Sequence, residues 1–234
     1  MDKLTRKEMK SDKFALEVQH SVEYVAEHRR QLVRYGLPAL AVIVIAVGIY
    51  FYRNHMHDVR QEALRDAMLV QNAQVGPAAN AQTLAFQTNE ARTKAVVKAW
   101  TDLVNKYPGT DEAYTGHYFL GTTAADNGNL AEAEKQFRMV ADGADGPYAS
   151  MAKIALGQVL AGEGKLAEGE KLVQSVIDHP TVLVSKESAT LVLVDLIKTS
   201  DPERARKLLD PLRTSTRSAV SKAAIGVYGE LSQK

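Results

Sequence analysis

The amino-acid sequence predicts an all-α protein, in which one N-terminal transmembrane helix precedes a stack of helical hairpins, an α-solenoid. A long uncharged apolar run lies near the N-terminus, and a block of sequence recurs in the second half of the chain. The helix formers Ala, Leu, Lys, Glu, Gln and Arg dominate the composition. Because Val, Ile and Thr do not alternate between Asn-Gly turns, we expect no strands.

The apolar run covers residues 36–52, GLPALAVIVIAVGIYFY. At about 1.5 Å per residue it spans roughly 25 Å, near the lower limit for crossing a bilayer core of about 30 Å. The aromatic residues at its end favour the headgroup layer, and Arg34 and Arg53 can snorkel at its two ends. A soluble helix of this length would show a polar face, so the run predicts a transmembrane helix.

The transmembrane helix is expected to remain as an anchor rather than to be cleaved as a signal peptide. Thirty-five residues precede it, and bulky aromatic residues followed by Arg53 occupy the place of a cleavage site. The chain has no Cys, which excludes disulfides and lipid attachment through an N-terminal Cys. Arginines near the two ends balance each other, but further basic residues in the N-terminal tail favour a cytoplasmic N-terminus.

Three regions are predicted: a cytoplasmic tail at 1–35, the transmembrane helix at 36–52 and a repeat domain at 53–234. The tail contains an amphipathic helix whose apolar residues recur at helical spacing: Phe14, Val18, Val22 and Val25. This helix either lies on the membrane surface or docks a cytoplasmic partner. Acidic and basic side chains nearly cancel in 53–234, which argues against nucleic-acid binding.

The part of the chain that leads into the repeats predicts two helices separated by a loop at 76–83. The first covers 56–75, with one apolar face formed by Val59, Ala63, Ala67 and Val70. The second resumes near Leu84, with one side formed by Val96, Val97, Trp100, Leu103 and Val104. The sequence Tyr107-Pro108-Gly109 ends this helix, and Thr110 or Asp111 is placed to cap the next one.

The recurring block is the strongest pattern in the chain. Residues 128–135, GNLAEAEK, return as 164–171, GKLAEGEK, at an offset of 36 residues. Leu120-Gly121 returns as Leu156-Gly157 at the same offset, and 201–207 forms a degraded third copy in phase. Self-similarity at this length predicts helical hairpins that stack because none buries its apolar face alone.

Each copy resembles the tetratricopeptide repeat. The best copy carries that family's small and aromatic positions: Leu120, Gly121, Gly128, Ala133 and Phe137. The next keeps Leu156, Gly157 and Gly164, but Gly169 replaces the Ala and Val173 replaces the Phe. An earlier copy keeps only its second helix, with Trp100 at the aromatic position.

These positions have a steric interpretation. Small residues let the two helices of a hairpin approach, and Gly128 supplies the left-handed turn between them. Phe137 is expected to fill the gap to the next hairpin. A last helix at 218–231 is expected to cap the stack through Val220, Ala223, Ala224, Val227 and Leu231.

No motif predicts an enzyme, a cofactor or a metal site. His55 and His57 point apart on a helix, and neither a nucleophile elbow nor a phosphate loop nor a dinucleotide fingerprint occurs. The recurring glutamates are interpreted as a solvated helix surface: Glu132, Glu134, Glu168 and Glu170.

The order of parts resembles the ancillary SecYEG translocon subunit (YfgM-type) family. That resemblance implies a single-pass protein of the bacterial inner membrane with a periplasmic C-terminal domain. It implies protein partners, namely the translocon, chaperones or exported chains, held on a concave face lined by the first helix of each hairpin. The expected partner-binding residues are Tyr118, Thr122, Asp126, Gln158, Glu187 and Lys198.

Two other functions fit the same pattern. A membrane-anchored scaffold for an envelope, division or secretion complex would have one stable stoichiometric partner. A receptor for targeting peptides would face the cytosol and would require the opposite topology.

Overall fold

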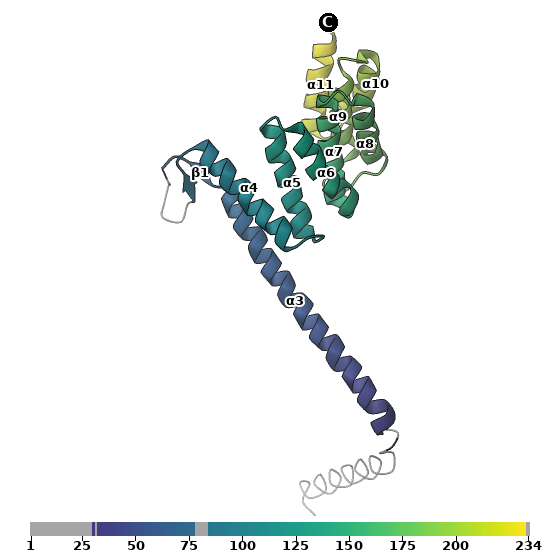
Figure 1. Ribbon diagram of the computed structural model, residues 1–234. Coiled ribbons are helices and arrows are strands. Elements are labelled where there is room, and N and C mark those ends of the chain that lie inside the picture. The colour runs from purple at the N-terminus through teal and green to yellow at the C-terminus, as the bar shows by residue number, and fades with distance from the viewer. Residues whose placement is uncertain (1–29, 31, 78–83, 233–234) are drawn as a thin grey trace, which may run out of the picture. The chain divides into compact units, whose positions relative to one another are not determined.

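The computed structural model describes residues 30, 32–77 and 84–232, and it confirms the all-α class (Figure 1). The predicted amphipathic helix and most of the predicted loop at 76–83 lie outside these residues. The chain divides into two compact units, 1–59 and 60–234.

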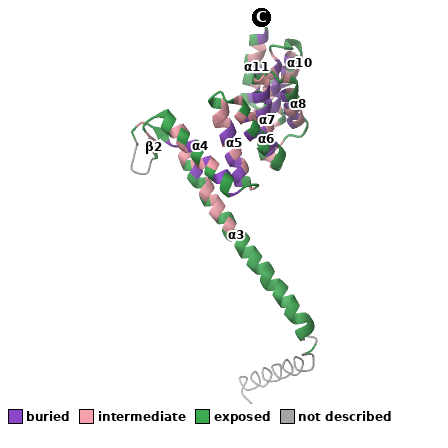
Figure 2. Cartoon of the chain, in the orientation of Figure 1, coloured by how far each residue is buried: buried purple, intermediate pink, exposed green. Residues whose placement is uncertain are grey.

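The described part of the first unit is helical. A short π-helix, η1 (Leu32–Gly36), is followed directly by α3 (Leu37–Gln71). The segment from Val33 to Gln71 is long and apolar enough to cross a membrane, judged by its length and composition, and its most apolar window has no buried residue. Figure 2 shows the first part of α3 exposed throughout.

The predicted separate helix at 56–75 is wrong in its bounds, because α3 is one helix that ends at Gln71. The Arg92 side chain accounts for this end: its Nε donates to the carbonyl of Ala73 at 2.8 Å and its Nη2 to that of Gln71 at 2.6 Å. A cation placed at the last carbonyls of a helix also complements the helix dipole.

The expectation of no strands is also wrong. β1 (Gln74–Val75) and β2 (Ala85–Phe86) pair in parallel, and β2 lies in the stretch predicted to begin a helix. The helix instead begins at Asn89 as α4 (Asn89–Lys106), because the Thr88 hydroxyl caps it by accepting from the Ala91 N–H. Two-residue strands are too short to produce an alternating pattern.

The helix predicted at 56–75 corresponds to the C-terminal part of α3, and the structure pairs it with α4. The C-terminal part of α3 serves as the first helix of this hairpin: Ala67 is buried, and Trp100 Nε1 donates to Gln71 Oε1 at 2.9 Å. Trp100 is fully buried and stacks on Phe119, with ring centroids 4.7 Å apart. Val97, predicted to belong to the buried side of α4, is exposed.

Glu112, at the start of the following helix, binds the same part of α3. Its carboxylate accepts from Gln61 Nε2 at 2.7 Å and from Arg60 Nε at 3.2 Å. Glu112 is buried, so these bonds replace the water that its carboxylate loses on folding.

Three hairpins and a last helix follow α4, which confirms the predicted stack (Figure 1). Their bounds are α5 (Asp111–Asp126) with α6 (Leu130–Gly143), α7 (Gly146–Gly162) with α8 (Leu166–Asp178), α9 (Lys186–Ile197) with α10 (Pro202–Arg213), and α11 (Ser218–Ser232). The first helices α5, α7 and α9 lie side by side in that order. Buried residues gather along the inner faces of these hairpins (Figure 2).

The hairpins close at the small residues that the repeat predicts. A Cβ added at Gly121 would lie 2.8 Å from a ring carbon of Phe137, so only glycine leaves room for that ring. Gly128 and Gly164 adopt positive φ angles of 76° and 82° at the turns inside the two hairpins.

Gly169 permits a closer approach than the Ala of the first copy would. A Cβ at Gly169 would lie 2.5 Å from the carbonyl oxygen of Gly157 in the facing helix. The backbones of α7 and α8 therefore meet directly, and Val173 fills the space that Phe137 fills one repeat earlier.

The predicted helix caps and the capping helix are present. Thr110 caps α5, and Asp201 caps α10, which begins with a proline. In α11 the side chains of Val220, Ala224 and Leu231 are buried against the core formed by α8 to α10. Ala223, assigned by its spacing to the same face, is exposed.

Candidate functional site

A groove of about 350 Å³ opens between α5 and α7, with α6 beneath it. The first helices of two successive hairpins form its walls, as expected for a concave binding face. It is lined by Tyr118, Thr122, Ala125 and Asp126 of α5, Leu130 and Phe137 of α6, and Ala155, Gln158 and Val159 of α7. Four of the six predicted partner-binding residues thus share one groove: Tyr118, Thr122, Asp126 and Gln158.

The floor of the groove is apolar and aromatic. Phe137 is almost wholly buried, and its ring centroid lies 5.5 Å from that of Tyr118. Burial raises the pKa of the Tyr118 phenol, so this side chain stays neutral at physiological pH.

The rim of the groove is polar. Asp126 and Gln158 are exposed on opposite walls. The Thr122 hydroxyl donates to the Tyr118 carbonyl at 3.0 Å, so its proton is already used within α5. Asp126 and Gln158 are therefore the side chains best placed to bind a polar group that enters the groove.

Glu187 and Lys198, the other two predicted residues, do not line this groove. They lie at opposite ends of α9, and each forms an ion pair of its own. The Glu187 backbone N–H and the Ser185 hydroxyl hold the pKa of the Glu187 carboxyl below its ordinary value, and Arg217 adds to this effect. Asp195 raises the pKa of Lys198 through a 2.6 Å contact.

The floor residues Leu130, Phe137, Ala155 and Val159 were not among the predicted binding residues. Ala155 lies three residues before Gln158 and four residues before Val159, so the helical period of α7 carries a signal for both apolar residues. Leu130 and Phe137 belong to the second helix of a hairpin, and only the packed structure places them beneath the first helices.

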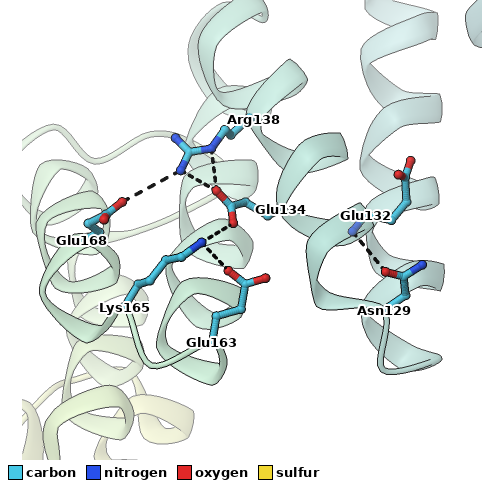
Figure 3. A network of polar contacts seen from close by, with 7 residues as sticks. All are labelled: Asn129, Glu132, Glu134, Arg138, Glu163, Lys165 and Glu168. Carbon is cyan, nitrogen blue, oxygen red and sulfur yellow. Dashed lines mark hydrogen bonds and ion pairs between the residues drawn. The ribbon is translucent and has the colours of Figure 1, made fainter.

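A network of charged side chains joins the second helices of successive hairpins (Figure 3). Glu134 of α6 accepts from Arg138 Nη2 at 2.6 Å and from Lys165 Nζ, at the turn into α8, at 2.8 Å. One repeat later, Arg204 pairs with Glu170 at 2.6 Å. Glu168 of α8 also pairs with Arg138 of α6, at 3.9 Å (Figure 3). Three of the recurring glutamates, Glu134, Glu168 and Glu170, therefore form ion pairs between hairpins rather than only a solvated surface.

The network predicts a pH-dependent contribution to stability. Hydrogen bonds from Lys165 and Arg138 lower the pKa of Glu134 to about 2, from an ordinary value of about 4.5. Because the folded-state pKa is depressed, the contribution is complete above about pH 4.5 and is lost as the pH falls towards 2. We expect Glu134→Gln to lower the unfolding temperature at pH 7. Near pH 2 the variant and the unmodified protein should unfold at about the same temperature.

Thermal unfolding at a series of pH values checks this prediction. Asp142→Asn provides the control, because Asp142 is an exposed carboxylate on the same helix. This variant should leave the pH dependence of the unfolding temperature almost unchanged. If the unfolding temperatures of Glu134→Gln and of the unmodified protein differed by the same amount at pH 7 and at pH 2, the prediction would be contradicted.

Within the described residues, no group of three or more His, Cys, Asp or Glu side chains is arranged to hold a metal ion. The comparisons with known proteins give one match: the family model described as tetratricopeptide repeat-like domain covers residues 33–182, more than half of the chain. No curated protein and no solved structure matches the chain.

Proposed function

The chain belongs to the tetratricopeptide repeat-like domain family, a family of protein-interaction repeats, and on this premise we propose that it is a membrane-anchored protein-binding protein. Its partners occupy the groove between α5 and α7. The main support for this proposal is that Tyr118, Asp126 and Gln158 line one open groove whose floor is apolar.

The anchor is the helix at 36–52, and the repeat domain at 53–234 faces the periplasm of a bacterium whose inner membrane holds the anchor. The tail at 1–35 is cytoplasmic. This assignment is supported by the exposed, apolar first part of α3, which has no polar face to turn towards water. It is also supported by the basic residues of the N-terminal tail.

The binding activity serves protein export: the repeat domain associates with the Sec translocon and passes exported chains to chaperones. The support for this part is the order of tail, anchor and repeat domain, which resembles the YfgM-type ancillary subunits.

Fusions to the C-terminus test the orientation. In a bacterial host, we expect a C-terminal alkaline phosphatase to be active and a C-terminal green fluorescent protein to be dark, because phosphatase folds only outside the cytoplasm. Fluorescence without phosphatase activity would overturn the periplasmic assignment and would leave a cytosol-facing receptor.

Photo-crosslinking tests the partners. A photo-crosslinking residue in place of Gln158 should yield adducts with translocon subunits and with many exported chains. The same residue in place of Lys222, exposed on α11, serves as the control and should yield few adducts. A single stoichiometric adduct at position 158 would instead support a scaffold, and equal patterns at both positions would contradict binding in the groove.

A further inference from the structure

We propose that the groove selects an extended peptide segment in which a Lys or Arg side chain lies beside an aliphatic one. Asp126 binds the cation, and the floor around Phe137 and Ala155 receives the aliphatic side chain. This inference rests on the proposed function, because it assigns the chemistry of the segment that occupies the same groove.

Asp126 carries a negative charge where its own helix disfavours one. It is the last residue of α5, and the last turn of α5 contains no basic residue. The carbonyl end of a helix has a partial negative charge, so a carboxylate there is destabilising unless a cation approaches it. Among the described residues, no ion pair involves Asp126, and it is the one charged residue that lines the groove.

The next hairpin shows how a carboxylate at the end of a first helix is otherwise accommodated. Glu163 lies at the C-terminal end of α7, the corresponding first helix, and Lys165 Nζ contacts it at 2.7 Å. Glu163, which lies outside the groove, thus has a cationic partner within the chain. Asp126, at the rim of the groove, has no cationic partner among the described residues, so a binding partner supplies the cation.

The rest of the groove matches a short peptide with one apolar side chain. Its volume of about 350 Å³ falls at the lower end of the range of ligand pockets, about 300–1,000 Å³. The small side chain of Ala155 leaves space above Phe137, and the Gln158 amide offers both a donor and an acceptor for the peptide backbone. An acidic segment would meet repulsion from both Asp126 and the carbonyl end of α5.

Fluorescence anisotropy of labelled peptides with the full-length protein in detergent tests this inference. The probes are three unstructured peptides of about ten residues that differ only at their centre: Lys-Leu, Gln-Leu and Glu-Leu. We expect the Lys-Leu peptide to bind about tenfold more tightly than the Glu-Leu peptide. Asp126→Asn should remove that preference, lowering the affinity for the Lys-Leu peptide and raising that for the Glu-Leu peptide about threefold each, while leaving the Gln-Leu peptide unchanged.

Asp142→Asn is the matched control, because it removes an exposed carboxylate that does not line the groove, and it should retain the preference. Thermal unfolding adds a second readout: Asp126→Asn should unfold at the same or a higher temperature, because the variant loses an unfavourable charge at a helix end.

Two further variants separate failure of this inference from failure of the proposed function. Gln158→Trp and Ala155→Trp fill the groove and should weaken all three peptides; Gln158 is exposed, so its substitution leaves the core intact. If both bind every peptide normally, the groove is not the binding site and both proposals fail. Suppose instead that both tryptophan variants weaken binding, but that the unmodified protein and Asp126→Asn each bind the three peptides with equal affinity. In that case only the selection of a basic segment is overturned.

Discussion

Replacing Phe137 with Ala is expected to destabilise the repeat domain by about 3–5 kcal/mol. The ring is 2% exposed, lies over Gly121 in its own hairpin and belongs to a cluster that includes Leu156 of the next one. Its removal leaves a cavity between two hairpins, and the surrounding helices cannot collapse into it without losing their other contacts.

The single tryptophan of the chain gives a direct readout of this effect. Trp100 is fully buried in α4, so its fluorescence should report unfolding of the repeats in a denaturant titration. Met139→Ala on the same helix is the control, because Met139 is half exposed and its removal should cost less than about 1 kcal/mol. If Phe137→Ala had a free energy of unfolding as high as that of the control, the assignment of Phe137 to the buried aromatic position of the repeat would be wrong.

Replacing Gly169 with Ala is expected to destabilise the protein by about 1–3 kcal/mol, even though the first copy of the repeat has Ala133 there. In an unconstrained helix the same change would stabilise by about 1 kcal/mol, since Ala is the better helix former. Here the new Cβ would lie 2.5 Å from the Gly157 carbonyl oxygen, and relieving that overlap requires α7 and α8 to move apart.

Gly226→Ala is the matched control, because nothing lies within 4 Å of the Cβ that it adds in α11. It should stabilise by about 0.4–1 kcal/mol, chiefly by restricting the unfolded chain. The same denaturant titration measures both variants. A Gly169→Ala variant that gains stability as Gly226→Ala does would contradict the close approach of α7 and α8.

The repeat made the hairpins predictable from sequence. The offset of 36 residues located the turns at Gly128 and Gly164, and both adopt the positive φ expected of them. The residues that contact each other within one hairpin are close in the sequence, so their spacing is enough to predict the contact. The two-residue strands left no comparable signal, and the apolar face predicted at 56–75 did not show which helix would cover it, because both depend on segments that meet only after folding.

The candidate groove was predictable in part for the same reason. The helical period of α5 placed Tyr118, Thr122 and Asp126 on one face, and the repeat offset added Gln158. Glu187 and Lys198 belong to the third hairpin, whose first helix α9 lies beside α7, so they do not line the groove between α5 and α7. Their assignment to the binding face stays a prediction.

The class of the fold, the apolar helix and the hairpin turns could be predicted from the amino-acid sequence alone, because each depends on local spacing and composition. The distance between successive helices and the side chains beneath them depend on long-range packing, which the spacing of residues does not encode. At positions 133 and 169 the same repeat pattern holds Ala and Gly, and the choice follows from the distance between two backbones. Glu163, at the end of α7, pairs with Lys165, whereas Asp126, at the end of α5, has no ion pair within the described part of the chain.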